Sequence, residues 1–345
     1  DIPVLTAGQS FILGYTNETD GLYKATKKDP VIIFDDFTGA FKWVNFTFKV
    51  KSSAMKMIKA NTEITSLRYL FHLMGFLNFT SSEHKRLWIS AYSEFMVPVP
   101  PLEVQREIVR ILDNFTELTA ELTAELTARK KQYECYRENL FVFDDKNKFS
   151  KIISELCPDG VEYKSLLSVA EVLYGFPCNA SLFNTDGEGM PVARIRDVIL
   201  GQSVTYTTEV VPEKYILSYG DLLVGMDGNF HVSNWKTAGG ILCQRVCKVF
   251  SRDNTVLLDG FIAHWLKPVI IQIEDSKKGG TVKHLLDKDI KAVFIPVPPL
   301  EVQREIVRIL DNFTELTAEL TAELTAIQKQ YKYYRDKLLD FKEVK

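Results

Sequence analysis

The segment PVPPLEVQREIVRILDNFTELTAELTAELTA spans residues 98–128, and the same letters recur without a change at residues 296–326. In each copy a proline pair is followed by some forty residues that contain neither Gly nor Pro. Proline suits the first helical position because its missing N–H would be unpaired there anyway. The Leu, Ala, Glu, Gln and Arg that follow favour helix. Each copy is therefore predicted to form one long helix.

Apolar residues recur along these helices in steps of four and three, the pattern of a coiled-coil seam. The stripe contains Ile108, Ile111, Phe115, Leu118, Leu122 and Leu126 in the first copy, and Ile306, Ile309, Phe313, Leu316, Leu320 and Leu324 in the second. The repeated TAEL tetrapeptide adds a stutter to this spacing. A rod of about 60 Å with one apolar stripe needs a partner helix, which is either the other copy or a helix of another protein.

Composition sets bounds on the rest of the chain. Its 345 residues, 46% of them hydrophobic, suffice for at least two cores. The net charge of −3 and the isoelectric point near 6.1 are unlike those of a free-standing nucleic-acid-binding protein, which is usually basic. The five cysteines form no CxxC pair, so neither a disulfide framework nor a zinc site is expected, and Cys243 and Cys247 are expected to be buried thiols. No apolar run reaches the ~20 residues of a membrane span.

Four segments follow: a first module at residues 1–97, a helical spacer at 98–143, a second module at 144–295 and a second spacer at 296–345. A short apolar run predicts a strand at 31–34, and alternating apolar and polar residues predict one at 41–50. Residues 192–200, 204–211, 221–224 and 240–250 are also predicted to be strands. Short helices are expected at 66–76 and 261–268, and a flexible basic loop at 277–280. This mixture predicts an α+β fold for both modules.

The two modules differ in sequence but share an outline. Ile2-Pro3-Val4 has a counterpart in Met190-Pro191-Val192, and residues 34–43 resemble residues 224–235. About fifty residues separate the first long helix from Met190, whereas only Asp1 precedes Ile2. We therefore expect roughly forty residues of the first module to lie outside this chain.

A variable module followed by the PVPPLEVQREIVRILDNFTELTAEL helix, twice in succession, strongly resembles the specificity (S, HsdS) subunit of type I restriction–modification systems. The resemblance rests on both long helices, the TAEL units and the lead-in GTVKHL at residues 280–285. It implies two target recognition domains, each reading one half of a split DNA site. It also implies an antiparallel coiled coil with a pseudo-two-fold arrangement.

The same resemblance implies the partners of the chain. Two methyltransferase (M) subunits are expected on the paired helices, while the presence of restriction (R) subunits stays open. No cofactor is expected in this chain, and S-adenosylmethionine is expected in the partner methyltransferase. The implied location is the cytoplasm of a bacterium or archaeon.

Candidate DNA contacts are residues that can pair with bases or phosphates. Arg and Asn can pair bidentately with guanine and adenine edges, while Lys and Thr more often hold phosphates. The candidates are Arg194, Arg196, Asn229, Lys236, Thr281, Lys283 and His284 in the second module, and Lys42, Lys51, Lys85 and Arg86 in the first. For each of them, a solvated surface charge is an equally good interpretation.

The sequence gives little support for catalysis. It contains no Asn-Pro-Pro-Tyr or Asp-Pro-Pro-Tyr tetrapeptide for amino methylation and no P-loop, and its histidines lack metal-site spacing. Methyl transfer and cleavage are therefore expected in partner chains. Two alternatives remain open, a coiled-coil scaffold that binds proteins and an enzyme with its own active site. A neighbouring gene for an adenine methyltransferase would favour the specificity subunit.

Paired helices between two DNA-reading modules should act as a ruler. Removing one TAEL unit from each copy shortens each helix by about 6 Å, against about 3.4 Å per base pair. We predict that the preferred spacer becomes shorter by about one or two base pairs while both half-sites stay unchanged. Methylation mapping measures both quantities, and altered half-site sequences would refute the ruler.

Overall fold

The computed structural model describes residues 1–342 except residues 9, 52, 78–85 and 278–282. The chain divides into two compact units. The first contains Asp1–Leu126 together with Glu319–Lys345, and the second contains Thr127–Ala318. Each unit therefore consists of one globular module, the end of one long helix and the beginning of the other.

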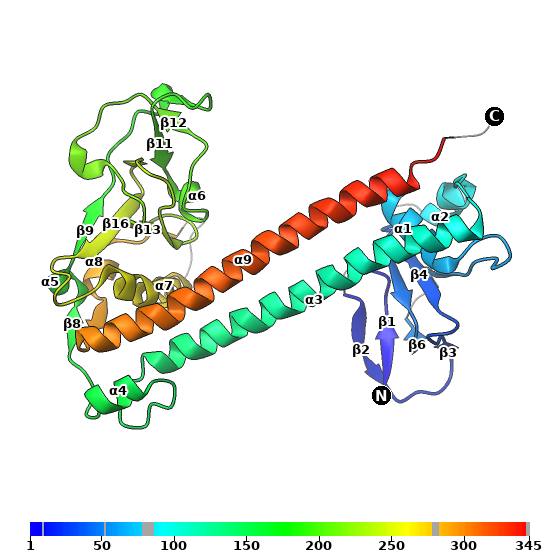
Figure 1. The fold of residues 1–345 in the computed structure, drawn as a ribbon, viewed down its shortest axis with the longest axis horizontal. Coiled ribbons are helices and arrows are strands. Elements are labelled where there is room, and N and C mark those ends of the chain that lie inside the picture. Colours follow the sequence, from blue (N-terminus) through cyan, green and yellow to red (C-terminus); the bar gives the residue numbers. More distant parts are fainter. Residues whose placement is uncertain (9, 52, 78–85, 278–282, 343–345) are drawn as a thin grey trace. The chain divides into compact units, whose positions relative to one another are not determined.

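The two repeated segments form the longest helices, α3 (Leu102–Leu140) and α9 (Leu300–Leu339) (Figure 1). In the first unit, Phe115 near the start of α3 stacks on Tyr334 near the end of α9, with ring centroids 5.4 Å apart. In the second unit, Tyr136 near the end of α3 lies 5.0 Å from Phe313 near the start of α9. The helices therefore run antiparallel, as the resemblance implied.

The long helices are buried on a second face that the heptad pattern did not include. Five residues of the predicted stripe are buried, namely Ile108, Leu122, Leu126, Ile306 and Leu320, whereas Leu118 is 36% exposed. Leu112 and Leu310 lie outside the stripe, yet both are fully buried. Leu112 packs with Tyr69 and Leu73 of the first module, and Leu310 belongs to the core of the second. Each helix thus serves its module as well as the helix pair.

The first module has two sheets. Their strand orders are β2-β1-β6-β3 and β5-β4-β7. The strands are β1 (Ile2–Leu5), β2 (Ile12–Thr16), β3 (Leu22–Lys24), β4 (Val31–Asp35), β5 (Phe41–Val44), β6 (Thr47–Val50) and β7 (Met55–Ile58). Helix α1 (Leu67–Leu77), helix α2 (Leu87–Ser90) and a 3-10 turn (Tyr92–Glu94) follow. Central strand β4 is apolar on both faces, because Ile33 joins the cluster of Leu5 and Ile32 joins the cluster of Met74.

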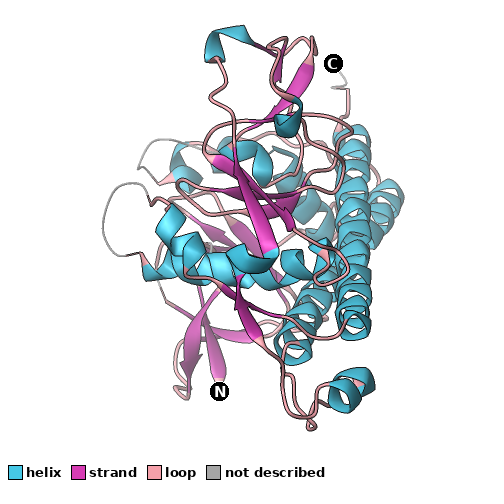
Figure 2. Ribbon diagram, turned by 90° about the vertical axis from the view of Figure 1, so that its left-hand side faces the viewer, coloured by secondary structure: helices cyan, strands magenta, loops and turns pink. Residues whose placement is uncertain are grey.

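The second module is larger, and Figure 2 distinguishes its strands from its helices by colour. Its strands are β8 (Tyr163–Ser165), β9 (Ala170–Tyr174), β10 (Phe183–Asn184), β11 (Met190–Ala193), β12 (Tyr206–Thr207), β13 (Leu222–Gly225), β14 (Val232–Asn234), β15 (Ile241–Leu242), β16 (Val246–Ser251) and β17 (Phe294–Pro296). Its helices are α4 (Lys151–Leu156), α5 (Leu166–Val169), α6 (Ile195–Val198), α7 (Asp259–Ser276) and α8 (Asp287–Lys291), with 3-10 turns at Ala180–Leu182 and Glu213–Tyr215. The sheets have the orders β10-β12-β11-β15, β14-β13-β16-β9 and β17-β8.

The two modules share the outline expected from their sequences. Strand β1 pairs in parallel with β6 through Val4 and Lys49, and β11 pairs in parallel with β15 through Val192 and Ile241. Strands β4 and β13 are both central, each between two antiparallel neighbours. The counterparts proposed around Pro3 and Pro191 therefore occupy equivalent strands.

Several predicted elements end elsewhere in the structure. The strand expected at 192–200 stops at Ala193 and gives way to α6, while the strand expected at 204–211 is reduced to Tyr206–Thr207. The strand expected at 240–250 is two strands, separated by a turn at residues 243–245. Helix α7 is longer than predicted and passes through Pro268. Periodicity alone could not locate these ends, because tertiary pairing sets them.

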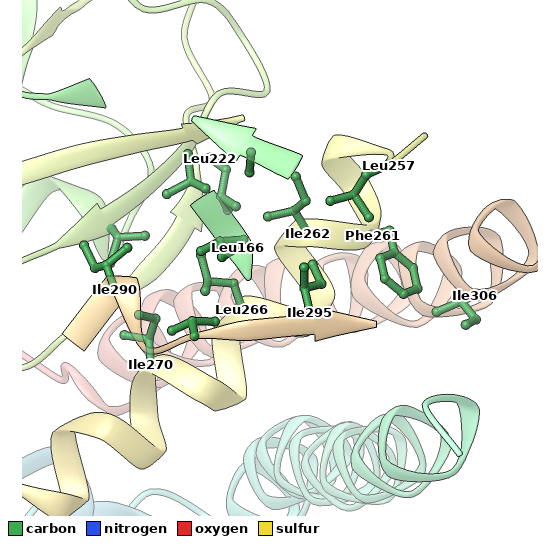
Figure 3. Packing of buried hydrophobic residues seen from close by; sticks show 14 of the residues in the cluster. Leu166, Leu222, Leu257, Phe261, Ile262, Leu266, Ile270, Ile290, Ile295 and Ile306 are labelled. Carbon is green, nitrogen blue, oxygen red and sulfur yellow. The ribbon is translucent and has the colours of Figure 1, made fainter. Parts of the chain in front are cut away.

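One apolar cluster joins the second module to its helix (Figure 3). It combines residues of the sheet, of α7 and of the first turns of α9. Its labelled members are Leu166, Leu222, Leu257, Phe261, Ile262, Leu266, Ile270, Ile290, Ile295 and Ile306. Because α9 contributes to this core, the module and the start of α9 form one packed body. In the described residues, no helix has both the length and the apolar character that crossing a bilayer requires.

The two faces of α3 predict different costs of truncation. Leu112→Ala should lower the free energy of unfolding by about 2–5 kcal/mol, because it empties a fully buried site. Leu118→Ala should cost less, about 1–2 kcal/mol, because that side chain is 36% exposed and leaves no enclosed cavity. Denaturant unfolding of the isolated chain measures both. Equal costs would contradict the second buried face.

Candidate functional site

A buried glutamine joins each long helix to its module. The amide oxygen of Gln105 accepts hydrogen bonds from Ser66 N at 2.9 Å and Thr65 Oγ1 at 3.1 Å. Its amide nitrogen donates to the carbonyl oxygens of Ile64 and Pro100, at 2.9 and 2.8 Å. The side chain is fully buried, so these bonds replace those that water would make.

Gln303 repeats this junction in the second unit. Its oxygen accepts from Leu258 N at 2.9 Å, and its nitrogen donates to the carbonyl oxygens of Val256 and Pro298, both at 2.8 Å. Ser66 and Leu258 therefore occupy equivalent places, as do Ile64 and Val256. Most of these contacts are to the backbone, so unrelated module sequences can make the same junction.

A histidine–aspartate pair adds a second contact in both units. His72 Nε2 of α1 lies 2.7 Å from Asp113 Oδ1, and His264 Nε2 of α7 lies 2.8 Å from Asp311 Oδ1. In the first unit Arg68 Nε also donates to Asp113, at 2.7 Å. Burial acts to raise the pKa of Asp113, but the hydrogen bonds from His72 and Arg68 and the Arg68 charge outweigh it and hold that pKa below its usual value.

The second module contains a cleft of about 580 Å³ beside the end of β13. It is lined by Cys178, Ala180, Phe183, Arg194, Ile195, Arg196, Ile199, Asp227, Gly228, Asn229, His231, Cys243, Gln244 and Arg245. We call it the polar cleft after the charged and amide side chains on its wall, although most of its exposed lining is apolar. Its lining combines cationic donors with amide side chains, the groups that read base edges in a DNA groove.

The polar cleft brings together several residues that the sequence singled out. Arg196 and Asn229 are exposed on its wall. Arg194 is half-buried, and its guanidinium donates to Asp197 Oδ2 at 2.7 Å and to Thr205 Oγ1 at 2.7 Å. Arg194 therefore has a structural role in addition to any contact with DNA.

Two further candidates approach the cleft from residues 283–284. The carbonyl of Lys283 accepts from Gly228 N at 2.9 Å, and its ammonium lies 3.8 Å from Glu274. His284 Nδ1 lies 2.7 Å from Asp227 Oδ1. Thr281 lies outside the described residues.

Lys236 lies at a different place in the second module. It lines a second cleft of about 650 Å³ together with Lys267, Ser233, Asn234 and Gly260. Burial and the charges of Arg137 and Lys236 hold the pKa of Lys267 below its usual value. Two lysines line this cleft together with Asp311, and the lowered pKa of Lys267 reflects a local excess of positive charge that favours an anionic ligand such as a phosphate.

The described candidates of the first module lie on separate elements. Lys42 lies half-buried on β5, Lys51 is exposed just after β6, and Arg86 is exposed just before α2. Lys85 lies outside the described residues. Strand β4 ends in a turn, in which Asp35 Oδ1 accepts from Thr38 N at 2.8 Å.

Sequence reasoning missed four polar residues of the polar cleft: Asp227, His231, Gln244 and Arg245. Gln244 and Arg245 fall within the single strand that the sequence predicts at 240–250. The turn between β15 and β16 contains no Gly or Pro, so no residue signals it.

The expectation of free thiols was wrong for Cys243. It forms a disulfide with Cys178, because the bridge between Phe176 and Cys243 places the two Cα atoms 5.7 Å apart. Cys247 is a buried thiol as expected, and burial raises its pKa to about 12. In the part of the chain that the structure describes, no cluster of His, Cys, Asp and Glu could hold a metal ion.

Comparison with known proteins connects both modules to one family. A family model described as the type I restriction modification DNA specificity domain matches residues 1–129 and 158–328. The chain is 37% identical, over 367 residues, to the specificity subunit of the Escherichia coli type I restriction enzyme EcoR124I/EcoR124II. That similarity covers 99% of this chain and 87% of the relative.

Two further proteins extend the comparison. A putative type I restriction enzyme specificity subunit of Haemophilus influenzae is 28% identical, over 96% of this chain and 86% of its own length. The crystal structure of a type I restriction–modification S subunit from M. genitalium superposes with a TM-score of 0.64 at 13% identity, covering 99% of this chain and 89% of that chain. The last similarity shows a shared fold.

The Asp113 junction predicts a pH-dependent stability. The lowered pKa of Asp113 contributes stability that is present above its unfolded value of about 3.8 and is lost as the pH falls below it. Asp113→Asn should therefore lower the free energy of unfolding by about 1–2 kcal/mol at pH 7, after allowance for partial exposure, and by less at pH 3.

Denaturant unfolding at the two pH values measures this difference. The control is Glu107→Gln, which removes a fully solvated ion pair with Arg110 on the same helix. Surface pairs of that kind contribute little, so the control should change stability less at either pH. A cost for Asp113→Asn that is the same at both pH values would contradict the assignment.

Proposed function

Because the chain belongs to the type I restriction–modification DNA specificity family, we propose that its two modules read the two unlike halves of one bipartite, asymmetric DNA site. The chain is the DNA sequence-specificity subunit of such a system. In this arrangement the α3–α9 pair sets the spacing between the two half-sites, and partner subunits carry out the chemistry.

The observation that carries the proposal is the repeated junction. Gln105 and Gln303 lie at equivalent positions of the repeated helical segment and hold equivalent backbone groups of their modules. The surfaces that these modules present differ, however, because their sequences differ. A DNA site with two unlike halves requires two modules that are attached in the same way but present different surfaces to the DNA.

Reading by the second module is assigned to the polar cleft. Arg196 and Asn229 supply exposed donor and amide groups for base edges. Lys236 and Lys267 supply charge for the phosphate backbone in the second cleft. In this division one cleft of the module supplies groups for base edges and the other supplies charge for the phosphate backbone.

The chemistry is assigned to other subunits. Two methyltransferase subunits, which bind S-adenosylmethionine, dock on the α3–α9 pair, and restriction subunits join where the system has them. The support comes from the family and from the sequence, which contains neither an amino-methylation tetrapeptide nor a P-loop. This chain contributes recognition and spacing.

Methylation mapping of genomic DNA tests the proposal. Cells that carry this chain and its companion methyltransferase are compared, by single-molecule sequencing, with cells that lack the chain. We expect one split motif that disappears with the gene. In a chimaera whose residues 144–295 come from another family member, one half of the motif should change and the other half and the spacer should not.

Other outcomes would count against the proposal. A continuous motif, or a chimaera that changes both halves, would contradict one module reading one half-site. No gene-dependent motif, together with no DNA binding by the reconstituted complex, would favour a protein-binding scaffold instead.

A further inference from the structure

Three separate segments meet at Asp227, on the rim of the polar cleft. Met226 N donates to the carbonyl of Arg245, and Leu285 N donates to the carbonyl of Met226. Asp227 forms an isolated bridge with His284. The turn after β13, the turn before β16 and the segment before α8 are thus joined at the end of one sheet.

The carboxylate of Asp227 holds two exposed donors. Arg245 Nη1 donates to Oδ2, and His284 Nδ1 lies 2.7 Å from Oδ1. The carboxylate is only 17% exposed, whereas the side chain of Arg245 is 60% exposed. The aspartate is therefore more buried than the arginine and holds its Nη1, while Nε and Nη2 stay available to a ligand.

The backbone of Arg245 is unusual as well. Among the residues that the structure describes, it is the only one other than glycine with a positive φ, at 72°. Glycine would adopt this left-handed conformation without steric cost, and a long side chain does not. Strained positions of this kind concentrate at functional sites, where the side chain is needed.

We propose that Arg245 reads a guanine in the half-site of the second module, with Asp227 as its positioning residue. This inference rests on the proposed function and identifies one base of the half-site that the second module reads. The guanidinium offers donors only, and guanine presents two acceptors, O6 and N7, in the major groove. Adenine presents a donor beside its N7, which would face a donor of the arginine.

The charge around Arg245 favours a base edge over a phosphate. Asp227 offsets the positive charge of the guanidinium and repels a phosphate brought to the same place. Lys236 and Lys267, by contrast, have no carboxylate partner among the described residues and suit the backbone. Arg245 therefore suits hydrogen bonding to a base edge better than electrostatic attraction of a phosphate.

The test uses the complete complex of this chain with its methyltransferase. Binding is measured by competition between oligonucleotides that carry the mapped site and oligonucleotides with one base pair changed at a time. Arg245→Gly removes the side chain and relieves the backbone. It should reduce discrimination at one G·C pair of one half-site by roughly 5- to 150-fold and leave every other position unchanged.

Asp227→Asn tests the positioning role. It keeps the side-chain shape but weakens the hold on Arg245, so it should reduce discrimination at the same base pair. In the Arg245→Gly background it should add no further loss, because no guanidinium remains to be positioned. If Asp227 has a purely structural role, Asp227→Asn should lower affinity in both the wild-type and the Arg245→Gly backgrounds, and for changes at every base pair.

The outcomes separate this inference from the proposed function. If the wild-type complex has no sequence preference, the proposed function fails. If it has a split site that Arg245→Gly leaves unchanged, only the guanine assignment fails. A uniform loss over all sequences with a lower salt dependence would make Arg245 a phosphate contact and overturn the inference. So would a second half-site without a G·C pair.

Should Arg245→Gly fail to fold, as judged by thermal unfolding, Arg245→Gln serves instead. Glutamine keeps a side chain on the backbone and pairs best with adenine. The same G·C pair should then lose its preference, and the corresponding A·T pair should gain in relative affinity. An unchanged preference in a folded Arg245→Gln complex would equally overturn the inference.

Discussion

A buried amide that has hydrogen-bond partners on both its oxygen and its nitrogen anchors each module of this protein to a long helix. Gln105 and Gln303 are enclosed at the start of α3 and α9, and both ends of each amide are bonded. An unpaired polar group in such a place would cost about 1–3 kcal/mol, so the helix register and the module position are fixed together. The packing of Leu112 and Leu310 then adds apolar burial to the same contact.

The shared glutamine junction does not make the two modules alike. Arg68 in α1 donates to Asp113 and stacks over Trp43, at 4.8 Å from the ring centroid. Gly260 stands at the equivalent place in α7, where a Cβ would come within 3.0 Å of Val307 on α9. The second module therefore has an open, cation-lined cleft at a position that an arginine fills in the first. The same helix contact is therefore filled by an arginine in one module and left open in the other.

Much of the architecture could be predicted from the sequence, because the long helices follow from an unbroken helical pattern that occurs twice. The match between Pro3 and Pro191 could also be predicted, since proline marks an equivalent strand start in both modules. Burial of Leu112 could not be predicted, because a heptad template assigns one apolar face and the module creates another.

The polar cleft was predicted only in part. Arg196 and Asn229 could be predicted because Arg and Asn can pair with base edges. The turn at Arg245 could not, because it contains no turn-forming residue and its position is set by the hydrogen bond from Met226 N to the Arg245 carbonyl.

The backbone character of the Gln303 contacts has a consequence for how such proteins diversify. The N–H of residue 258 and the carbonyl of residue 256 would be present with any side chain except proline at residue 258. A module of quite different sequence can therefore be seated on the same helix if its chain follows the same path. Because the helix segments are also identical in sequence, recombination between the two repeats, or between two related genes, would join modules at matching junctions. The repeat thus offers a physical route by which new combinations of half-sites arise without redesign of the assembly that uses them.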